Sequence, residues 1–414
     1  MAKSLAFEAL KIADFRFFIT ARFCLTLAIQ MQALVMGWDL YSITKNPLSL
    51  GLLGLSEAAP FMLMALISGH WADRYNRKFL GSIGLIAFLF CSSLLFITQY
   101  MGRTADNVWI FYLCFGLVGL GRGLVGPSWN AILAEIVPKS LYANSSTWNS
   151  TMWQIAAVSG PALGGIIYGL MGAKSAYVLC LLLTILSIIS FVQIKYKAQH
   201  ESNKEESMLE SLKQGFRFVF SRQVLIGALT LDMFGVLFGG AVALLPVFAD
   251  QVLHIGPEAL GILRSAPAFG AVCMAVVLTF YPPVIRSGVK LLLSVALFGL
   301  SIFCFALSTN YWLSFALLFL SGAFDNISVV IRSTIVQLYT PNHMRGRVAS
   351  INSIFIGSSN ELGALESGVA AKFLGLIPSV LIGSSLTIGI TGFAARKWPK
   401  LRNFEIKKEL TERM

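Results

Sequence analysis

Charged side chains are scarce in this chain. Asp, Glu, Lys and Arg make up 13% of the 414 residues, hydrophobic residues make up 56%, and the mean hydropathy is +0.73. A soluble domain of this composition would expose far more apolar surface than water tolerates. The composition therefore excludes an ordinary soluble protein and indicates a chain whose solvent is the lipid bilayer.

Several kinds of chemistry lack the residues they need. Only four histidines occur, far apart, and no phosphate-binding glycine loop is present, so we expect neither an enzyme nor a cofactor. The six cysteines fall in apolar stretches without paired spacing, so we expect packing residues and no disulfide or metal site. The net charge of +12 lies beside expected helix ends, where anionic lipids attract it, and we expect no nucleic-acid partner.

Long apolar runs are abundant instead. A helix needs about 20 apolar residues to cross about 30 Å of hydrocarbon, and a helix satisfies its own backbone hydrogen bonds there. The sequence predicts an all-α membrane protein with twelve such helices, near residues 15–41, 48–70, 79–101, 108–134, 146–172, 174–194, 223–250, 258–281, 289–308, 311–337, 348–371 and 374–395.

The distribution of cations predicts the orientation. Of the 32 Lys and Arg residues, four lie in expected external loops and four within spans, and the remaining 24 lie in segments that the positive-inside rule assigns to the cytoplasm. We therefore expect both termini in the cytoplasm. The mixed polar character of residues 1–16 favours an interfacial lead-in helix over a cleaved signal peptide.

The chain divides into two similar halves. A polar stretch, whose second part has apolar residues at helical spacing, separates two sets of six spans, so we expect a bundle over 1–194, a linker with an amphipathic segment over 195–222, a second bundle over 223–395 and a basic tail over 396–414. Residues recur between the halves at one offset of 203, and earlier in the halves at 210. The matches are Pro138, Asn149, Ser150, Gly160, Gly165 and Gly172 with Pro341, Asn352, Ser353, Gly363, Gly368 and Gly375, and Pro47 and Gly51 with Pro257 and Gly261. Duplicated halves are typical of transporters that rock about a central site.

The same offsets pair basic with acidic residues. Arg22 corresponds to Asp232, and Arg122 corresponds to Asp325. An unpaired charge inside a span is costly, so each should face a cavity or a partner. One hypothesis is that the four line the cytoplasmic half of a central cleft and pair across the halves when it closes; the alternative is static pairing that holds the bundles together.

A charged loop separates the second and third spans at residues 69–78 (GHWADRYNRK). Gly69 allows close helix approach, Asp73 can cap a helix or pair with a cation, and Arg74, Arg77 and Lys78 favour the cytoplasmic side. This loop resembles the one between helices two and three of the major facilitator superfamily. The resemblance implies two pseudo-symmetric six-helix bundles and a latch on the inner gate. The usual glycine of the motif is Asn76 here, which also tolerates left-handed backbone.

Two further motifs extend the resemblance. The run from Gly160 through Pro161 to Gly164 and Gly165 would give a kinked, close-packed seam, and it matches the core of a signature of the superfamily's antiporters, which export their substrates. Residues 119–123 (GLGRG) resemble the position where many proton-coupled members carry a buried arginine, so Arg122 is the first choice for coupling. A structural arginine that reaches the cytoplasmic interface is the alternative.

Carboxyl groups within spans are candidates for carrying the coupled proton. Glu361 has the central depth expected of such a group, followed by Glu57 and Asp39, because a carboxylate removed from water is protonated more readily. Polar and aromatic residues suit a cavity for an amphipathic organic substrate, although tryptophans also serve as interfacial anchors or core packing. The cavity candidates are Gln30, Trp129, Asn130, Asn149, Trp153, Gln154, Asn326 and Asn360.

The whole chain resembles the bacterial branch of the superfamily that holds the enterobactin exporter and drug efflux proteins. The residues that carry this are 21–23, 37–41, 47–60 and 344–348. The resemblance implies a monomer in the bacterial inner membrane that exports a small siderophore-like or drug-like molecule, in exchange for protons, by alternating access. The alternatives are an importer or uniporter on the same fold, and a non-transporting membrane receptor.

Overall fold

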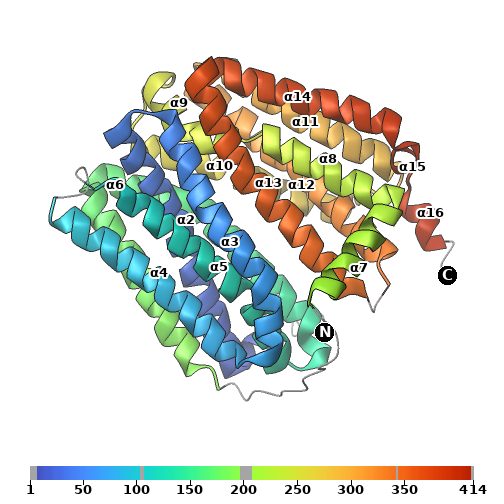
Figure 1. The fold of residues 1–414 in the computed structure, drawn as a ribbon, viewed down its shortest axis with the longest axis horizontal. Coiled ribbons are helices and arrows are strands. Elements are labelled where there is room, and N and C mark those ends of the chain that lie inside the picture. Colours follow the sequence, from blue (N-terminus) through green and yellow to red (C-terminus); the bar gives the residue numbers. More distant parts are fainter. Residues whose placement is uncertain (1–6, 103–106, 196–207, 342–343, 412–414) are drawn as a thin grey trace. The chain divides into compact units, whose positions relative to one another are not determined.

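The computed structural model describes residues 7–102, 107–195, 208–341 and 344–411, and in these ranges every regular element is helical (Figure 1). Three short 3₁₀ turns accompany the α-helices. The α-helices are α2 (Ala13–Thr44), α3 (Pro47–Arg74), α4 (Arg77–Tyr100), α5 (Trp109–Ile136), α6 (Tyr142–Gln193), α7 (Met208–Ser221), α8 (Gln223–Phe238), α9 (Leu245–Gln251), α10 (Pro257–Phe280), α11 (Ser287–Leu307), α12 (Tyr311–Tyr339), α13 (Arg345–Leu374), α14 (Leu376–Lys397), α15 (Pro399–Arg402) and α16 (Ile406–Thr411).

Ten helical segments of the described chain are long and apolar enough to cross a membrane. One of them, Lys139–Gln193, contains two of the expected spans, and α13 is long enough but more polar than the rest. The segments are therefore consistent with twelve crossings. The prediction of an all-helical membrane protein is confirmed.

Two glycines of the internal repeat make the same backbone break. Gly172 interrupts α6 at φ 81°, ψ 168°, and Gly375 separates α13 from α14 at φ 90°, ψ 161°. Residues with a side chain rarely adopt these angles, whereas glycine does so freely. Each glycine therefore ends one span and starts the next almost without a loop.

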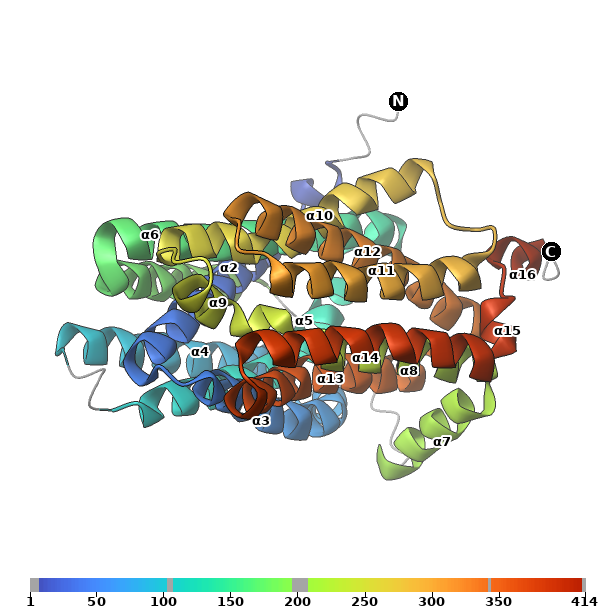
Figure 2. The same cartoon turned by 90° about the horizontal axis from the view of Figure 1, so that it is seen from above.

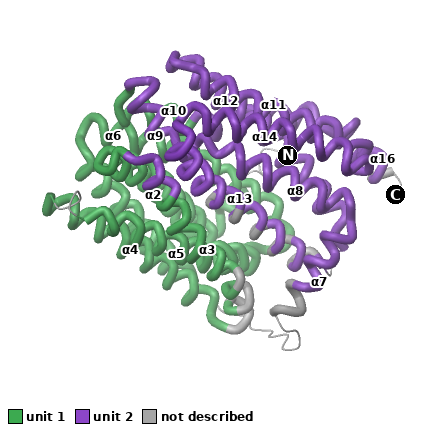
Figure 3. The backbone as a smooth tube through the Cα atoms, turned by 45° about the horizontal axis from the view of Figure 1, so that its top comes forward, with its two compact units in different colours: residues 1–45, 52–203, 255–265 green, residues 46–51, 204–254, 266–414 purple. Residues whose placement is uncertain are grey.

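The helices form two compact units (Figure 3). Unit 1 comprises residues 1–45, 52–203 and 255–265, and unit 2 comprises residues 46–51, 204–254 and 266–414. The first turns of α3 pack with unit 2 and the first turns of α10 pack with unit 1. Each unit is described by itself below.

Unit 1 is built on α2 and α6, with α4 and α5 side by side beside them (Figure 1). Its core has an aromatic centre, in which the Trp129 ring stacks on Phe191 at 5.0 Å between centroids and tilts against Phe18 at 5.7 Å. Aromatic pairs of this kind add to the stabilisation that burial provides. This cluster joins α2, α5 and the second part of α6.

Unit 2 is built on α8, α11, α12, α13 and α14, and Figure 2 shows α8, α11 and α14 side by side. The segment after α14 is docked on this unit. Leu401, Phe404 and Ile406 are buried in the same core cluster as Leu225 of α8 and Leu291 of α11. Part of the expected basic tail is therefore a structural element of the second bundle.

Candidate functional site

The loop between α3 and α4 is fixed by hydrogen bonds to helix ends. The Asn76 side chain accepts bonds from the backbone N–H groups of Lys78 and Phe79, at 2.9 and 3.4 Å, and so caps α4. Its φ of −59° shows that capping, and not the expected left-handed backbone, explains an asparagine here. The Lys78 ammonium donates to the carbonyls of Val192 and Ile194, which satisfies groups left open at the end of α6.

Arg77 forms an ion pair with Glu135 at the C-terminal end of α5. This contact joins the loop to α5 inside unit 1. The side chains of the other predicted loop residues, Gly69, Asp73 and Arg74, lie outside the described residues. Their part in a gate stays a prediction.

Two of the predicted coupling residues meet in unit 1. The Arg122 guanidinium of α5 forms an ion pair with the Glu57 carboxylate of α3, and it also lies 5.3 Å from the centre of the Phe61 ring. The charge-assisted hydrogen bond to the carboxylate and the cation–π contact with the ring both stabilise the guanidinium charge.

Glycines of α5 make this approach of α3 and α5 possible. A Cβ on Gly119 would lie 2.2 Å from the Glu57 carbonyl oxygen, and one on Gly123 would lie 2.5 Å from the Met64 side chain. Any larger residue at Gly119 would push the two helices apart. The GLGRG run therefore supplies both the close approach and the arginine.

The Arg122 side chain is 41% exposed, although it lies at the middle of the 28-residue helix α5. A charge at that depth is costly in hydrocarbon, so we expect the exposed side of Arg122 to face a polar space. The same face of α5 continues through Gly126, which has no atom within 4 Å of its Cβ position, to the exposed Asn130. This face is the described surface of unit 1 that best fits a cavity wall.

A second arginine acts on the same carboxylate. Arg264, in the part of α10 that packs with unit 1, interacts electrostatically with Glu57. Glu57 is 10% exposed, pairs with Arg122 and lies within electrostatic range of Arg264 in unit 1. Sequence reasoning counted Arg264 among the cations within spans but gave it no role, because its partner is distant in sequence.

Asp39 lies in a different environment. Its carboxylate is 5% exposed and accepts hydrogen bonds from two tyrosines of α6, Tyr168 at 2.5 Å and Tyr177 at 2.8 Å. The two phenols come from either side of the Gly172 break. Asp39 therefore ties α2 to both spans of α6, and neither tyrosine was expected from sequence.

In unit 2 Asp232 has a partner within its own unit. Asp232 of α8 forms an ion pair with Arg332 of α12, and both side chains are almost fully buried. A buried pair of this kind is costly to break from one side only. This partner differs from the cross-half pairing expected at sequence level, where Arg332 had no role; Arg22 and Asp325 are half-buried in their helices.

Glu361 lies in α13, but its side chain is outside the described residues. The first-ranked carboxylate of the sequence analysis thus has no described environment. Its place in proton coupling stays a prediction.

The predicted antiporter seam packs tightly within unit 1. Gly160 and Gly164 face α2, where their Cβ positions would lie 2.6 Å from the Gln30 side chain and 3.2 Å from the Met31 backbone. Gly165 faces the start of α10, and its Cβ would lie 2.7 Å from the Gly261 Cα. Pro161 occupies the turn between these two faces. In unit 2 the repeat partners Gly51 and Gly368 make the equivalent contact.

The predicted cavity residues fall into three groups. Asn130, Trp153 and Asn360 are exposed, and Gln30, Gln154, Asn149 and Asn326 are half-buried. The Oδ1 atoms of Asn149 and Asn326 are buried without a hydrogen-bond partner among the described residues, and so are free to bind a ligand or water.

Trp129 is the exception among the cavity candidates. It is 0% exposed and is packed between Phe18 and Phe191 in the core of unit 1. Because its ring is buried in the core of unit 1, whereas the next residue, Asn130, is exposed, we remove Trp129 from the cavity. The core-packing alternative explains this tryptophan.

A hollow of about 650 Å³ lies between α3 and α5 but is almost wholly apolar. It is lined by residues on either side of Ser56 and Gly116, and it includes none of the predicted cavity residues. It suits hydrocarbon better than a polar substrate.

Residues 4–413 match the sequence profile of a family described as transmembrane secretion effectors. The chain is similar to the staphyloferrin A transporter of Staphylococcus aureus, with 22% identity over 379 residues, 91% of this chain and 94% of the relative. It is similar to the enterobactin exporter EntS of Citrobacter koseri, with 23% identity over 90% of this chain and 91% of the relative. It is also similar to the multidrug resistance protein MdtG of Escherichia fergusonii, with 26% identity over 81% of both chains.

Solved structures share the fold at low identity. A bacterial homologue of the human lysosomal transporter Spinster, inward-facing and unoccupied, matches with a TM-score of 0.73 and 16% identity over 94% of this chain and 98% of that chain. The POT family transporter PepTSo matches with a TM-score of 0.75 and 12% identity over 94% of this chain and 99% of that chain.

Proposed function

Because this chain belongs to the transmembrane secretion effector family of the major facilitator superfamily, we propose that it exports a small amphipathic organic molecule across the bacterial cytoplasmic membrane. The substrate is siderophore-like or drug-like. The names of the relatives support both classes, since they include a staphyloferrin transporter, an enterobactin exporter and multidrug resistance proteins. The closely packed Gly160–Gly165 seam supports export.

Transport is coupled to protons through Glu57 and Arg122. The observation that carries this proposal is the ion pair between them at mid-span, with 41% of the arginine side chain exposed. A proton bound to Glu57 neutralises the carboxylate that pairs with Arg122. Protonation therefore weakens the contact between α3 and α5 and favours a rearrangement of α5. Asp39 and Glu361 are the further carboxyl candidates, and Asp39 is already held by two phenols.

Alternating access moves the site between the two sides of the membrane. The Arg77–Glu135 pair holds the cytoplasmic end of unit 1, and Asp73 and Arg74 latch the inner gate beside it. Arg22 and Asp325 contribute charges to the cytoplasmic half of the cleft, whereas Asp232 is paired with Arg332 inside unit 2. Gln30, Asn130, Asn149, Trp153, Gln154, Asn326 and Asn360 provide the polar wall for a substrate. The protein acts as a monomer with both termini in the cytoplasm.

The test uses the purified protein in liposomes that carry an imposed proton gradient and a pH-sensitive dye inside. A catecholate siderophore and then a lipophilic cation are added, and the internal pH is followed. One of the two should trigger proton movement. Glu57→Gln and Arg122→Ala should each abolish that movement, because each removes one partner of the ion pair, while thermal unfolding shows that both variants remain folded.

Lys290→Gln is the matched control, since it removes an exposed charge at the start of α11 outside the proposed machinery. It should transport like the parent protein. Normal proton movement in Glu57→Gln would exclude this carboxylate as the coupling group. Silence with both probes in tight liposomes would favour the uniporter or importer alternative, and binding without any flux would favour a receptor.

A further inference from the structure

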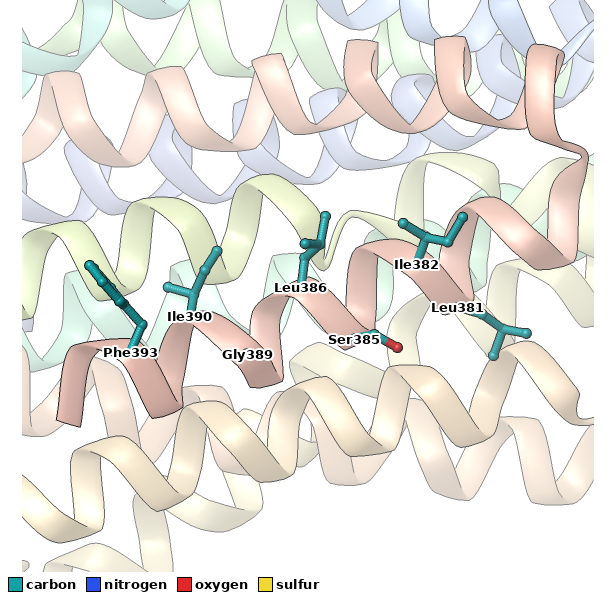
Figure 4. A pocket seen from close by; sticks show the side chains of 7 residues that line it. All are labelled: Leu381, Ile382, Ser385, Leu386, Gly389, Ile390 and Phe393. Carbon is teal, nitrogen blue, oxygen red and sulfur yellow. The ribbon is translucent and has the colours of Figure 1, made fainter. Parts of the chain in front are cut away.

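One hollow of the structure lies on the surface of a single helix. It has a volume of about 460 Å³ and follows one face of α14, as Figure 4 shows. The lining is Leu381, Ile382, Ser385, Leu386, Gly389, Ile390 and Phe393. These residues repeat at helical spacing, and all but Ser385 are apolar.

The hollow exists because two small residues stand where larger ones would fill it. Gly389 has no atom within 4 Å of its Cβ position, and the Ser385 side chain is short. The larger side chains on either side of these two positions therefore form the walls of the hollow. From Leu381 to Phe393 the face is about 18 Å long at 1.5 Å per residue. Half of a hydrocarbon core of about 30 Å is about 15 Å. The hollow therefore has the length of an acyl chain in one leaflet.

The cytoplasm-side end of the hollow is cationic. Lys397 lies one turn beyond Phe393 on the same face, and its ammonium group lies 5.4 Å from the centre of the Phe393 ring. Arg396 and Lys400 are exposed next to it. Arg222 is also exposed, and the neighbouring Gln223 side chain donates to the Lys397 carbonyl at 3.5 Å, which places the start of α8 at this end of α14.

Two acids of the described chain follow this group in the sequence. Glu405 and Glu409, the acids on the docked segment after α14, face other partners: the Glu405 carboxylate accepts from the Arg286 backbone N–H, and the Glu409 carboxylate accepts from the Tyr339 hydroxyl at 2.6 Å. An apolar groove that ends in exposed cations at the membrane interface complements a phospholipid with a negative headgroup.

We propose that the α14 groove is a binding site for one anionic phospholipid of the cytoplasmic leaflet. An acyl chain lies along Gly389 and Ser385, and the phosphate is bound at Lys397 with Arg396, Lys400 and Arg222 around it. This lipid holds the last span at a fixed depth through α14. The site is separate from the Glu57–Arg122 pair and does not depend on which substrate is exported.

The test is native mass spectrometry of the full chain released from nanodiscs that contain equal amounts of phosphatidylglycerol and phosphatidylcholine with identical acyl chains. The parent protein should retain one phosphatidylglycerol in preference to phosphatidylcholine. Lys397→Gln should lower that preference about fivefold, the effect of one cation near an anionic surface. Gly389→Leu should remove retention of the lipid, because the new side chain fills the groove without meeting a neighbour.

Gly392→Leu is the matched control, because it adds the same side chain to the same helix at a second open glycine that does not line the groove. It should retain the lipid like the parent. Equal retention of both lipids by the parent protein would overturn the proposal, as would undiminished retention by Gly389→Leu. Loss of lipid in Gly392→Leu to the same extent as in Gly389→Leu would also refute the groove as the binding site.

Discussion

At the scale of single residues, two of the carboxyl candidates for proton coupling are bound within the protein. The Glu57 carboxylate pairs with Arg122 and faces Arg264, and the Asp39 carboxylate accepts from Tyr168 and Tyr177. Neither is an isolated negative charge that would by itself favour a cationic substrate. These two acids are thus no evidence by themselves against an anionic substrate.

Asp39→Asn tests the role of the two phenols. An amide carries no charge and presents one oxygen and one NH₂ group, so one tyrosine hydroxyl can no longer donate to an oxygen there, which should destabilise the protein by about 1–3 kcal/mol. The expected result is a lower thermal unfolding temperature in detergent, with Tyr177→Phe giving a shift in the same direction. If the Asp39→Asn shift is the same in a Tyr168→Phe/Tyr177→Phe background, the contact does not stabilise the fold.

Sequence reasoning identified individual charged residues but not their partners. Depth along a span can be counted from the sequence, which is why Glu57 and Arg122 were both found. Rotation about the helix axis and the choice of neighbour depend on tertiary packing, so Arg332 as partner of Asp232, and Tyr177 as partner of Asp39, could not be found that way. Trp129 was misplaced for the same reason, since its ring faces the core.

At the scale of elements, α5 positions the arginine through its glycines. Gly119 brings α3 close enough for the ion pair, whereas Gly126 borders open space on the accessible face. We therefore expect a larger residue at Gly119 to disturb the packing of α5 on α3, and the same residue at Gly126 to leave that packing unchanged.

Gly119→Ala should separate α3 from α5, because the Glu57 carbonyl that the new Cβ meets is backbone and cannot rotate away. We expect about 1–3 kcal/mol of destabilisation from overpacking and a loss of proton-coupled transport. Thermal unfolding and the liposome assay measure the two effects. Gly126→Ala should transport normally, and equal behaviour of the two variants would show that the close approach at Gly119 has no functional role.

Element boundaries were more accessible from sequence than element contacts. Gly172 and Gly375 were found as a repeated pair, and the structure shows why both halves keep a glycine there: each has a positive φ. Asn76 was noted in the sequence for its tolerance of left-handed backbone, and the structure shows that it caps α4 instead.

At the scale of the whole molecule, the glycines that recur at fixed offsets predict equivalent helix contacts in the two halves of the chain. Each unit contains one of these contacts. Gly165 meets Gly261 within unit 1, and Gly51 meets Gly368 within unit 2. The offsets of 203 and 210 in the sequence thus correspond to equivalent packing contacts. This part of the architecture was readable from sequence because close helix approach restricts the residue type.

The expected orientation can be tested by labelling single added cysteines with a membrane-impermeant maleimide. Lys174→Cys, at the turn within α6, should react in intact cells, because the cation distribution assigns this turn to the outside. Lys290→Cys, at the start of α11, should react only after permeabilisation. The parent protein, whose six cysteines lie in the spans, should stay unlabelled. The reverse pattern would invert the assigned topology.

The docking of residues 401–406 also bears on how the protein is made. Leu401, Phe404 and Ile406 fill the same core cluster as Leu225 of α8 and Leu291 of α11, yet the ribosome synthesises them only after all spans of unit 2. Until they emerge, the apolar side chains at the N-terminal ends of α8 and α11 lack part of their packing partners. Maturation of this bundle therefore depends on its last segment. We expect an insertase or chaperone to stay bound to the nascent protein until that segment is released from the ribosome.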